Sequence, residues 1–316
     1  MSQKKIIAVV GATGAQGGGV IRGILADTSG AFAARAITRN PNSEKALALK
    51  AQGVDVVAGE LDDEASLTAA LAGAYGVYFV TNFWEHFSPA KETAQGGNAA
   101  RAAKAAGVGH AIWSTFEDTR DSVPLSDDRM PTLQGRFKVP HFDAKAEANH
   151  YFTDAGVPTT FLLTSFYWDN LIHFGMGPKK GPDGRYAFTL PMGDKKLPGI
   201  AAEDIGRCAF GIFARGDALI GKTVGVAGDH LTGTEMAASL TRALHVDVDY
   251  NAVPPAVYRS FGFPGADDLG NMFQFKADFE GAYCAARNVE SSRALYPGLQ
   301  SFDAWLAKYG AQISLG

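Results

Sequence analysis

The chain has 316 residues, of which 46% are hydrophobic and 20% are charged, a composition typical of globular proteins. Its 29 basic and 33 acidic residues give a net charge of −4, which argues against binding nucleic acid by neutralising phosphates. Two cysteines are too few for a disulfide framework, the histidines lack metal-ligand spacing, and no run of about 18 apolar residues suggests a membrane span. The residue pattern therefore predicts no metal site. The N-terminus lacks the apolar region of a signal peptide, so we expect a cytoplasmic protein.

The first 115 residues alternate between short apolar runs and longer segments with helical spacing. The apolar runs predict strands at 6–10, 33–37, 54–58, 77–80 and 110–113. Strands separated by helical segments imply βαβ units, a parallel sheet and helices on both of its faces. The predicted fold class is therefore α/β, with a Rossmann-type doubly wound parallel sheet.

The pattern changes after residue 115. Residues 117–140 hold three prolines among charged residues and predict a surface excursion. A helix is predicted over about 141–155, a buried strand at 159–163, a hairpin turn at Asp183-Gly184 and a strand near 223–226 among C-terminal helices. We expect a Rossmann domain over 1–155, its core sheet continued by 156–170 and 197–228, and a C-terminal substrate or partner lobe formed mainly by 171–316.

A glycine-rich turn follows the first predicted strand. Residues 11–17 read Gly-Ala-Thr-Gly-Ala-Gln-Gly, a G-x-x-G-x-x-G pattern between a strand and a helix. Gly11 and Gly14 allow a sharp turn and a close approach to a pyrophosphate, and Gly17 allows the helix to pack on the strand. The pyrophosphate would meet free N–H groups at the start of the helix. In this context the motif favours dinucleotide binding over a purely structural turn.

The end of the second predicted strand distinguishes between two cofactors. An NAD site usually has an acidic residue there, but this strand ends at Thr38-Arg39-Asn40. The guanidinium of Arg39 suits a 2′-phosphate, whereas the alternative is a solvated surface arginine. The missing acid and the arginine together favour NADP(H).

The next two strand ends lie at the same edge of the sheet. Glu60 and Leu61 follow the third strand and are placed to edge an adenine, and nearby Asp63 alternatively caps the helix that begins near Glu64. Residues 81–84 (Thr-Asn-Phe-Trp) follow the fourth strand, where a nicotinamide ribose is expected. The alternative is that these aromatic residues only cover a helix.

Short-chain dehydrogenases carry Tyr-x-x-x-Lys on a helix, and none of the ten tyrosines here precedes a lysine by four residues. His141-Phe142-Asp143-Ala144-Lys145 occupies the corresponding stretch. Lys145 can hold the nicotinamide ribose, while His141 is either a proton donor or a surface residue at a helix start. Ser114 and Thr115 end the fifth strand, where a hydroxyl can orient a carbonyl. The catalytic residues are thus unknown, with these four as candidates.

The chain resembles the NmrA-like family of atypical short-chain dehydrogenases along nearly its whole length. The matching segments are 11–18, 38–41, 80–85, 141–145 and 262–273. The resemblance implies a smaller α/β C-terminal lobe and NADP(H) in the cleft, although Glu60 stands where the family usually has Asp. It implies cofactor contacts from Gly11, Thr13, Gly14, Ala15, Gln16, Gly17, Thr38, Arg39, Asn40, Glu60, Leu61, Thr81, Asn82, Phe83, Lys145, Tyr167, Trp168 and Asn170.

Two functions follow from these expectations. The missing tyrosine favours a dinucleotide-responsive regulator, or redox sensor, with little or no dehydrogenase activity. The alternative is an NADPH-dependent reductase of a quinone or other planar aromatic acceptor, and the aromatic residues Phe83, Trp84, Phe166, Tyr167 and Trp168 favour it as the floor of a pocket. A small planar substrate, a protein partner and a homodimer all stay open.

Overall fold

The computed structural model describes residues 4–316, which form two compact units. The first unit comprises the chain up to Asp118 together with His141–Leu163 and Glu203–Val224. The second comprises Thr119–Pro140, Thr164–Ala202 and Gly225–Gly316. Each unit is therefore assembled from stretches that are separated in the sequence.

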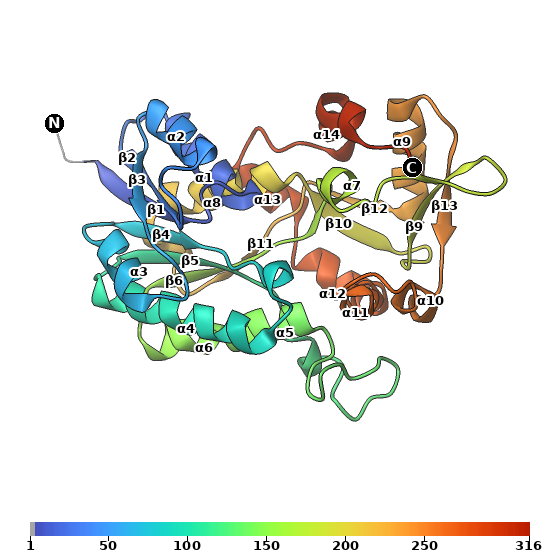
Figure 1. The fold of residues 1–316 in the computed structure, drawn as a ribbon, viewed down its shortest axis with the longest axis horizontal. Coiled ribbons are helices and arrows are strands. Elements are labelled where there is room, and N and C mark those ends of the chain that lie inside the picture. Colours follow the sequence, from blue (N-terminus) through green and yellow to red (C-terminus); the bar gives the residue numbers. More distant parts are fainter. Residues whose placement is uncertain (1–3) are drawn as a thin grey trace. The chain divides into compact units, whose positions relative to one another are not determined.

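A seven-stranded sheet forms the centre of the first unit (Figure 1). Its strands follow the order β11-β6-β5-β4-β1-β2-β3, and the pairs from β3 to β6 are parallel. The chain runs outward from β1 to β3 and returns beside β1 at β4, so the strand order reverses at β1, as in Rossmann folds. The predicted α/β fold class is confirmed. The strands are β1 (Lys5–Val10), β2 (Phe32–Thr38), β3 (Asp55–Ala58), β4 (Gly76–Phe79), β5 (His110–Thr115), β6 (Thr159–Leu163) and β11 (Thr223–Gly225).

Helices cover both faces of this sheet (Figure 1). The side chains of Ser43, Asp63 and Ser88 accept backbone N–H groups at the starts of α2, α3 and α4, which explains where these helices begin. The predicted helix over 141–155 is divided at Ala148 into α5 and α6. The helices of this unit are α1 (Ala15–Leu25), α2 (Glu44–Ala51), α3 (Glu64–Leu71), α4 (Pro89–Ala105), α5 (Pro140–Glu147), α6 (Asn149–Asp154) and α8 (Ala202–Ala214), with 3-10 turns η1 (Phe83–Glu85) and η3 (Gly216–Leu219).

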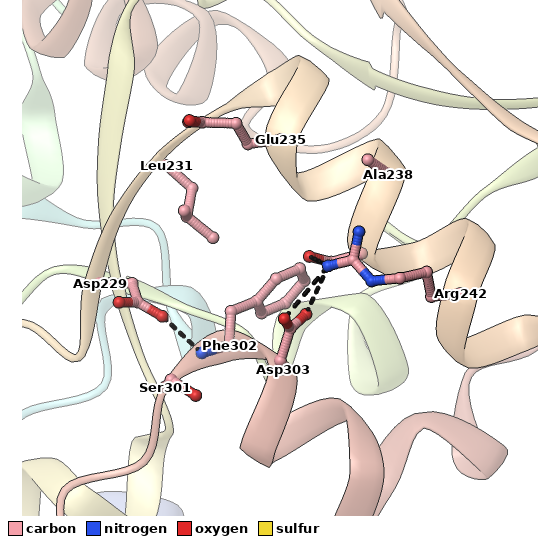
Figure 2. Close-up of a pocket in the computed structure, with 9 residues that line it drawn as sticks. Asp229, Leu231, Glu235, Ala238, Arg242, Ser301, Phe302 and Asp303 are labelled. Carbon is pink, nitrogen blue, oxygen red and sulfur yellow. Dashed lines mark hydrogen bonds and ion pairs between the residues drawn. The ribbon is translucent and has the colours of Figure 1, made fainter.

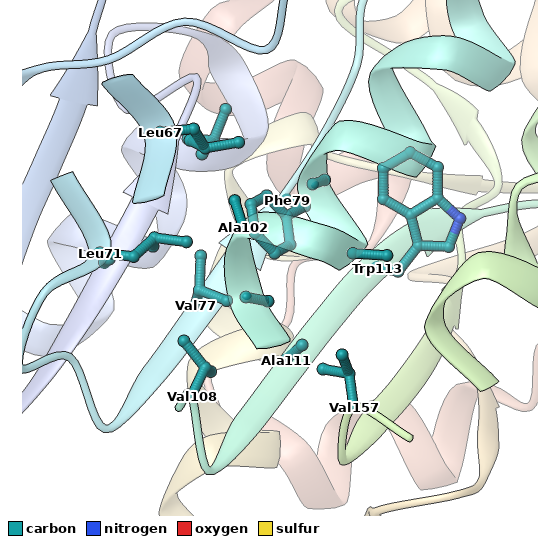
Figure 3. Packing of buried hydrophobic residues seen from close by; sticks show 14 of the residues in the cluster. Leu67, Leu71, Val77, Phe79, Ala102, Val108, Ala111, Trp113 and Val157 are labelled. Atoms are coloured by element: carbon teal, nitrogen blue, oxygen red, sulfur yellow. The ribbon is translucent and has the colours of Figure 1, made fainter. Parts of the chain in front are cut away.

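The hydrophobic core on the α3 and α4 side of the sheet is shown in Figure 3. Phe79 and Trp113 from the sheet and Leu67 from α3 are fully buried in it. The part of α4 that packs in this core carries four alanines, at 99, 100, 102 and 103, all at 0% exposure. These small side chains let a long helix lie close to the sheet and leave space for the aromatic rings.

Helices α1 and α8 approach each other so closely that only glycine fits between them. A Cβ added at Gly19 would lie 2.1 Å from the carbonyl oxygen of Glu203, and one added at Gly206 would lie 2.2 Å from that of Gln16. Real Cβ atoms do not approach backbone atoms so closely, so the glycines at 19 and 206 are required by helix packing. Helix α8 thereby supports the helix that follows the glycine turn.

The second unit contains two three-stranded sheets, β12-β10-β7 and β13-β9-β8. The antiparallel pair β8 and β9 confirms the hairpin predicted at Asp183-Gly184, where Gly184 has φ +83°. β12 and β13 were not predicted. In β13, Asp249 and Asn251 give the strand a polar pattern. The strands are β7 (Phe166–Tyr167), β8 (Lys179–Lys180), β9 (Tyr186–Leu190), β10 (Lys196–Ile200), β12 (Asp229–Thr232) and β13 (Val248–Ala252). Of the stretches expected to continue the core sheet, β6 and β11 do so, whereas β7 and β10 belong to this unit's own sheet.

Helices make up most of the remainder of the second unit. They are α7 (Asn170–His173), α9 (Gly233–Leu244), α10 (Pro255–Arg259), α11 (Ala266–Asp278), α12 (Glu280–Ala285), α13 (Val289–Leu295) and α14 (Phe302–Tyr309), with 3-10 turns η2 (Thr119–Asp121) and η4 (Gly310–Gln312). A cavity of about 250 Å³ lies against β12, α9 and α14 (Figure 2). Its charged side chains are engaged with the wall itself, since Arg242 pairs with Asp303 at 3.1 Å and Asp229 accepts the backbone N–H of Phe302 at 2.7 Å.

Residues 117–140 are not simply a surface excursion, as the prolines had suggested. The buried side chain of Asn271 on α11 donates to the carbonyl oxygens of Pro131 at 2.9 Å and Lys138 at 2.5 Å. Gln274 on the same helix donates to the carbonyl oxygen of Arg129 at 2.8 Å. The excursion is therefore anchored to α11 by amide side chains more than 100 residues away in the sequence, which no local pattern indicates.

Candidate functional site

The glycine turn has the geometry that a phosphate-binding loop needs. Gly11 has φ +70°, and the N–H of Gly14 donates to the carbonyl oxygen of Gly11 at 2.9 Å, which closes the turn. A Cβ added at Gly17 would lie 2.3 Å from that same carbonyl oxygen, so α1 can start against β1 only with glycine there. Helix α1 has no side-chain cap and no acidic residue in its first turn. Its positive end is thus left for an anion, and this part of the chain fits a dinucleotide.

The side chain of Gln16 is anchored to the sheet below the turn. Its Oε1 accepts hydrogen bonds from the hydroxyls of Tyr78 on β4 and Ser114 on β5, the latter at 3.1 Å. The hydroxyl of Thr115 donates to Oδ1 of Asn149 at 2.9 Å. Both candidate hydroxyls at the end of β5 are therefore engaged with protein acceptors, and the sequence did not point to Tyr78.

Arg39, at the end of β2, forms an ion pair with Glu85 in η1. Nη1 of Arg39 lies 2.6 Å from Oε1 of Glu85, and the two side chains are 65% and 49% exposed. The hydrogen bond and the charge of Glu85 raise the pKa of Arg39, with smaller contributions from Glu60 and Asp62. Arg39 is thus not a freely solvated arginine, because its guanidinium already pairs with a carboxylate and has other acidic residues nearby.

The other residues beside this strand end have local partners. The backbone N–H of Asn40, an exposed residue, donates to Oγ1 of Thr38 at 3.4 Å. Asp63 accepts the N–H of Ser66 at 3.0 Å and caps α3, so the capping alternative for Asp63 is confirmed. Glu60 is exposed and half-buried Leu61 follows it, which leaves their expected contacts with an adenine as a prediction.

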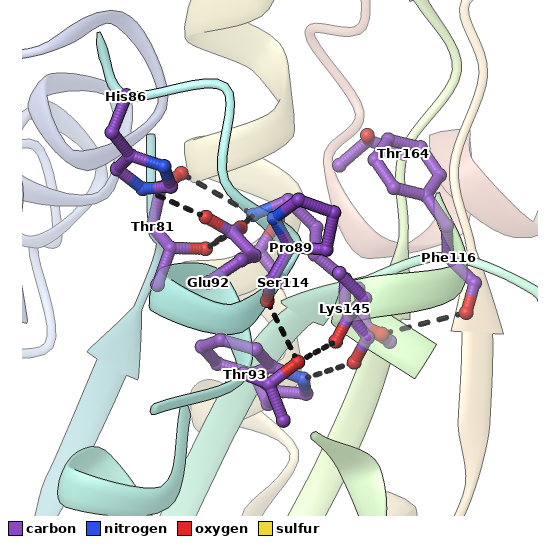
Figure 4. A network of polar contacts seen from close by, with 12 residues as sticks. Thr81, His86, Pro89, Glu92, Thr93, Ser114, Phe116, Lys145 and Thr164 are labelled. Atoms are coloured by element: carbon purple, nitrogen blue, oxygen red, sulfur yellow. Dashed lines mark hydrogen bonds and ion pairs between the residues drawn. The ribbon is translucent and has the colours of Figure 1, made fainter. Parts of the chain in front are cut away.

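Lys145 lies in a buried polar network (Figure 4). Its Nζ contacts Oε1 of Glu92 and Oγ1 of Thr81 and lies 3.3 Å from the carbonyl oxygen of Thr81. An ammonium group has three N–H donors, so these three acceptors occupy all of them. Lys145 can reach a ribose only by releasing one acceptor, and the Thr81 carbonyl is the most distant.

Glu92, on α4, is fully buried and is the central acceptor of the network. Burial disfavours its charge, but Lys145, His86 and Thr81 outweigh this effect and lower its pKa to about 2. His86 accepts the N–H of Ser88 at Nδ1, at 3.0 Å, so its proton lies on Nε2, which is 3.4 Å from Oε2 of Glu92. Sequence reasoning missed Glu92, although it is the only acidic residue between Pro89 and Ala105.

His141 is buried among aromatic rings and is not the surface residue expected as one alternative. Its side chain is 5% exposed, and its ring centroid lies 4.8 Å from that of Trp84, 5.9 Å from that of Phe83 and 6.0 Å from that of Phe116. The segment after β4 covers the start of α5 and explains this burial. Phe87, at the end of this segment, is 41% exposed and has φ +52°, a conformation uncommon for a bulky residue.

The predicted site residues Phe166, Tyr167, Trp168 and Asn170 belong to the second unit. Trp168 is 1% exposed, and its ring centroid lies 6.2 Å from that of Trp305. Phe166 is 4% exposed. Both therefore serve the packing of this unit rather than forming an accessible floor. Tyr167 and Asn170 are half-buried, and cofactor contacts from Tyr167, Trp168 and Asn170 stay a prediction.

Within residues 4–316, no helix is both long and apolar enough to cross a membrane. The same residues contain no group of three or more histidine, cysteine or acidic side chains placed to hold a metal ion. Cys208 is buried and Cys284 is half-buried, and burial raises the pKa of both thiols. These thiols are therefore poor nucleophiles in the folded protein.

Comparison with known proteins gives the family. The model of the NmrA-like family matches residues 3–306. The chain belongs to the NmrA-like family. A relative, the NmrA-like family domain-containing oxidoreductase FrzB of Cladobotryum sp, is 27% identical over 307 residues, covering 92% of this chain and 89% of the relative. The resemblance seen in the sequence motifs is thus confirmed.

Two solved structures share the fold of this NmrA-like chain. One is NmrA, a negative transcriptional regulator in complex with NADP, with a TM-score of 0.77 and 23% identity over 97% of this chain and 95% of that one. The other is the NADPH-dependent quinone oxidoreductase QOR2 of Escherichia coli complexed with NADPH, with a TM-score of 0.71 and 25% identity over 96% and 98%. The fold therefore occurs in a regulator and in a reductase.

Proposed function

We propose that this NmrA-like protein binds NADP(H) at the carboxyl edge of its seven-stranded sheet. The uncapped start of α1 behind the glycine turn would receive the pyrophosphate. Arg39 would receive the 2′-phosphate, because no acidic residue ends β2. Thr81 and Lys145 would lie toward the nicotinamide ribose. The NADP and NADPH complexes of NmrA and QOR2 support this assignment.

We further propose that the protein is a dinucleotide-responsive regulator with little or no activity on simple carbonyls. The observation that carries this proposal is the position four residues before Lys145, which holds buried His141 instead of a tyrosine. A phenol would donate a proton to a carbonyl there, and a missing general acid typically lowers a rate by about 10²–10⁴-fold. The saturated ammonium of Lys145 also has no spare donor with which to assist such a proton transfer.

A second candidate is an NADPH-dependent reductase of a quinone or other planar acceptor. The observation favouring it is the aromatic cluster of Phe83, Trp84, Phe87, Phe116 and His141, which ends in an exposed ring. When bound, the cofactor supplies a hydride, and a quinone needs less proton assistance at that step than a ketone does. Relatives named as oxidoreductases and the quinone oxidoreductase QOR2 support this candidate.

Calorimetric titration and an acceptor panel test these proposals together. We expect NADP⁺ to bind at least about tenfold more tightly than NAD⁺, a difference of about 1.4 kcal/mol, and Arg39→Ala to weaken NADP⁺ binding alone. Equal affinities in the wild type would contradict the assignment of NADP(H). NADPH oxidation should stay near background with ketones and aldehydes. Turnover limited to quinones would favour the second candidate, and rapid turnover of a simple ketone would contradict the regulator.

A further inference from the structure

The ion pair between Arg39 and Glu85 joins two segments on either side of the glycine turn. Arg39 follows β2 and Glu85 lies in η1 after β4, and both strands are direct neighbours of β1 in the sheet. Strand β1 runs into the glycine turn between them. The 2.6 Å contact therefore links the two sides of the edge at which a dinucleotide binds in such sheets.

Glu85 is the acid that contacts Arg39, although other acids lie nearby. Asp62 pairs with Lys91 at 2.9 Å and accepts the side-chain amide of Gln95 at 2.9 Å, so its charge is largely compensated. One carboxylate oxygen of Glu85 accepts a hydrogen bond from Nη1 of Arg39, and both side chains are exposed to solvent. An anion arriving from solvent thus meets a guanidinium that already holds a carboxylate.

We infer that Glu85 is a specificity-determining residue that competes with the cofactor's 2′-phosphate for Arg39. The inference rests on the proposed binding of NADP(H). A cofactor with a 2′-phosphate must displace Glu85 and then lies near its freed charge, whereas NAD(H) carries no group that competes for Arg39. Glu85 thereby lowers the preference for NADP(H) that Arg39 creates and leaves the affinity for NAD(H) unaffected.

Displacement of Glu85 would also remove one contact of the segment that covers His141. Glu85 directly follows Trp84 in the sequence. Trp84 is half-buried, whereas the other three tryptophans, Trp113, Trp168 and Trp305, are at most 1% exposed. Quenching of tryptophan fluorescence by acrylamide therefore reports mainly on Trp84. We expect adenosine 2′-monophosphate to increase this quenching and adenosine 5′-monophosphate to leave it unchanged, because only the first nucleotide presents a 2′-phosphate.

Glu85→Gln tests the competition, and Glu64→Gln is its matched control. Glu64 forms a similar exposed pair with Arg101, at 2.7 Å with side chains 43% and 52% exposed, away from Arg39. Because an exposed ion pair and a nearby like charge are each modest effects, we expect Glu85→Gln to tighten NADP⁺ and adenosine 2′-monophosphate about three- to tenfold. The affinity for NAD⁺ should stay within about twofold. Glu64→Gln should change none of these affinities.

The possible failures are distinguishable. If the wild type binds NADP⁺ but Glu85→Gln leaves its affinity unchanged, or tightens NADP⁺ and NAD⁺ equally, the inference is overturned while the proposed function stands. If the wild type binds neither dinucleotide, the proposed function fails and the inference falls with it. In the double variant with Arg39→Ala, Glu85→Gln should lose most of its effect, and a full effect without Arg39 would overturn the competition.

Discussion

Replacing Glu92 by glutamine removes the buried negative charge that Lys145 faces while preserving the shape of the side chain. The pKa of Glu92 is lowered from its ordinary value of 4.5 to about 2 in the folded protein. A difference of one in pKa corresponds to about 1.4 kcal/mol, so the charged form contributes about 3 kcal/mol to the free energy of unfolding at pH 7. We expect Glu92→Gln to lose about this amount at neutral pH.

The effect of Glu92→Gln should depend on pH with a definite sign. Because the pKa is lower in the folded state, the contribution of Glu92 is complete above the ordinary value of 4.5 and is lost as the pH falls toward about 2. The difference in unfolding free energy between wild type and variant should therefore shrink from about 3 kcal/mol at pH 7 to about 1 kcal/mol at pH 3. At still lower pH a protonated Glu92 resembles glutamine, and the two proteins should converge.

Urea unfolding followed by circular dichroism, at several pH values between 7 and 3, measures this difference. Glu64→Gln is the control, since its exposed pair with Arg101 contributes at most about 1 kcal/mol. Parallel loss of stability by wild type and Glu92→Gln over this pH range would refute the reasoning. It would show that Lys145 does not depend on Glu92 for its charge partner.

Two further predictions concern packing and thiol chemistry. Gly206→Ala should lower the free energy of unfolding by about 1–3 kcal/mol, because its Cβ would meet the carbonyl of Gln16, whereas Gly281→Ala, with open space around it, should raise it by about 0.5–1 kcal/mol. Similar urea midpoints for both variants would contradict the close packing of α1 and α8. Cys208 and Cys284 should react slowly with a disulfide reagent in the folded protein and rapidly in urea, because burial raises their pKa. Fast labelling of the folded protein would show that its thiols respond to redox conditions directly.

The sheet and the glycine turn could be predicted because their signals are local. A buried parallel strand is an apolar run, and Gly11, with φ +70°, and Gly17, whose Cβ would lie 2.3 Å from a backbone oxygen, have steric roles that favour glycine. The capping of α3 by Asp63 is equally local, since Asp63 and the donor N–H of Ser66 lie three residues apart. Each of these features depends on neighbours in the sequence.

The features that were missed depend on contacts between distant parts of the chain. Glu92 appears in the sequence as one charge on an alanine-rich helix, and only the fold brings it to Lys145. The burial of His141 requires the rings that follow β4, and the anchoring of residues 117–140 requires Asn271. The Arg39–Glu85 pair joins residues 46 positions apart, so Arg39 alone suggested a simpler phosphate site than the one observed.

The assembly of the first unit from three separated stretches affects how the protein can fold during synthesis. When the ribosome has completed residue 163, helix α8 and strand β11 have not yet been made, so the α8-facing side of α1 and the edge of β6 are uncovered. Contacts between such distant residues slow folding and leave sheet edges open to aggregation. A fragment ending near residue 163 should therefore be unsuitable as an isolated nucleotide-binding module, and a ribosome pause before residue 224 should increase dependence on chaperones.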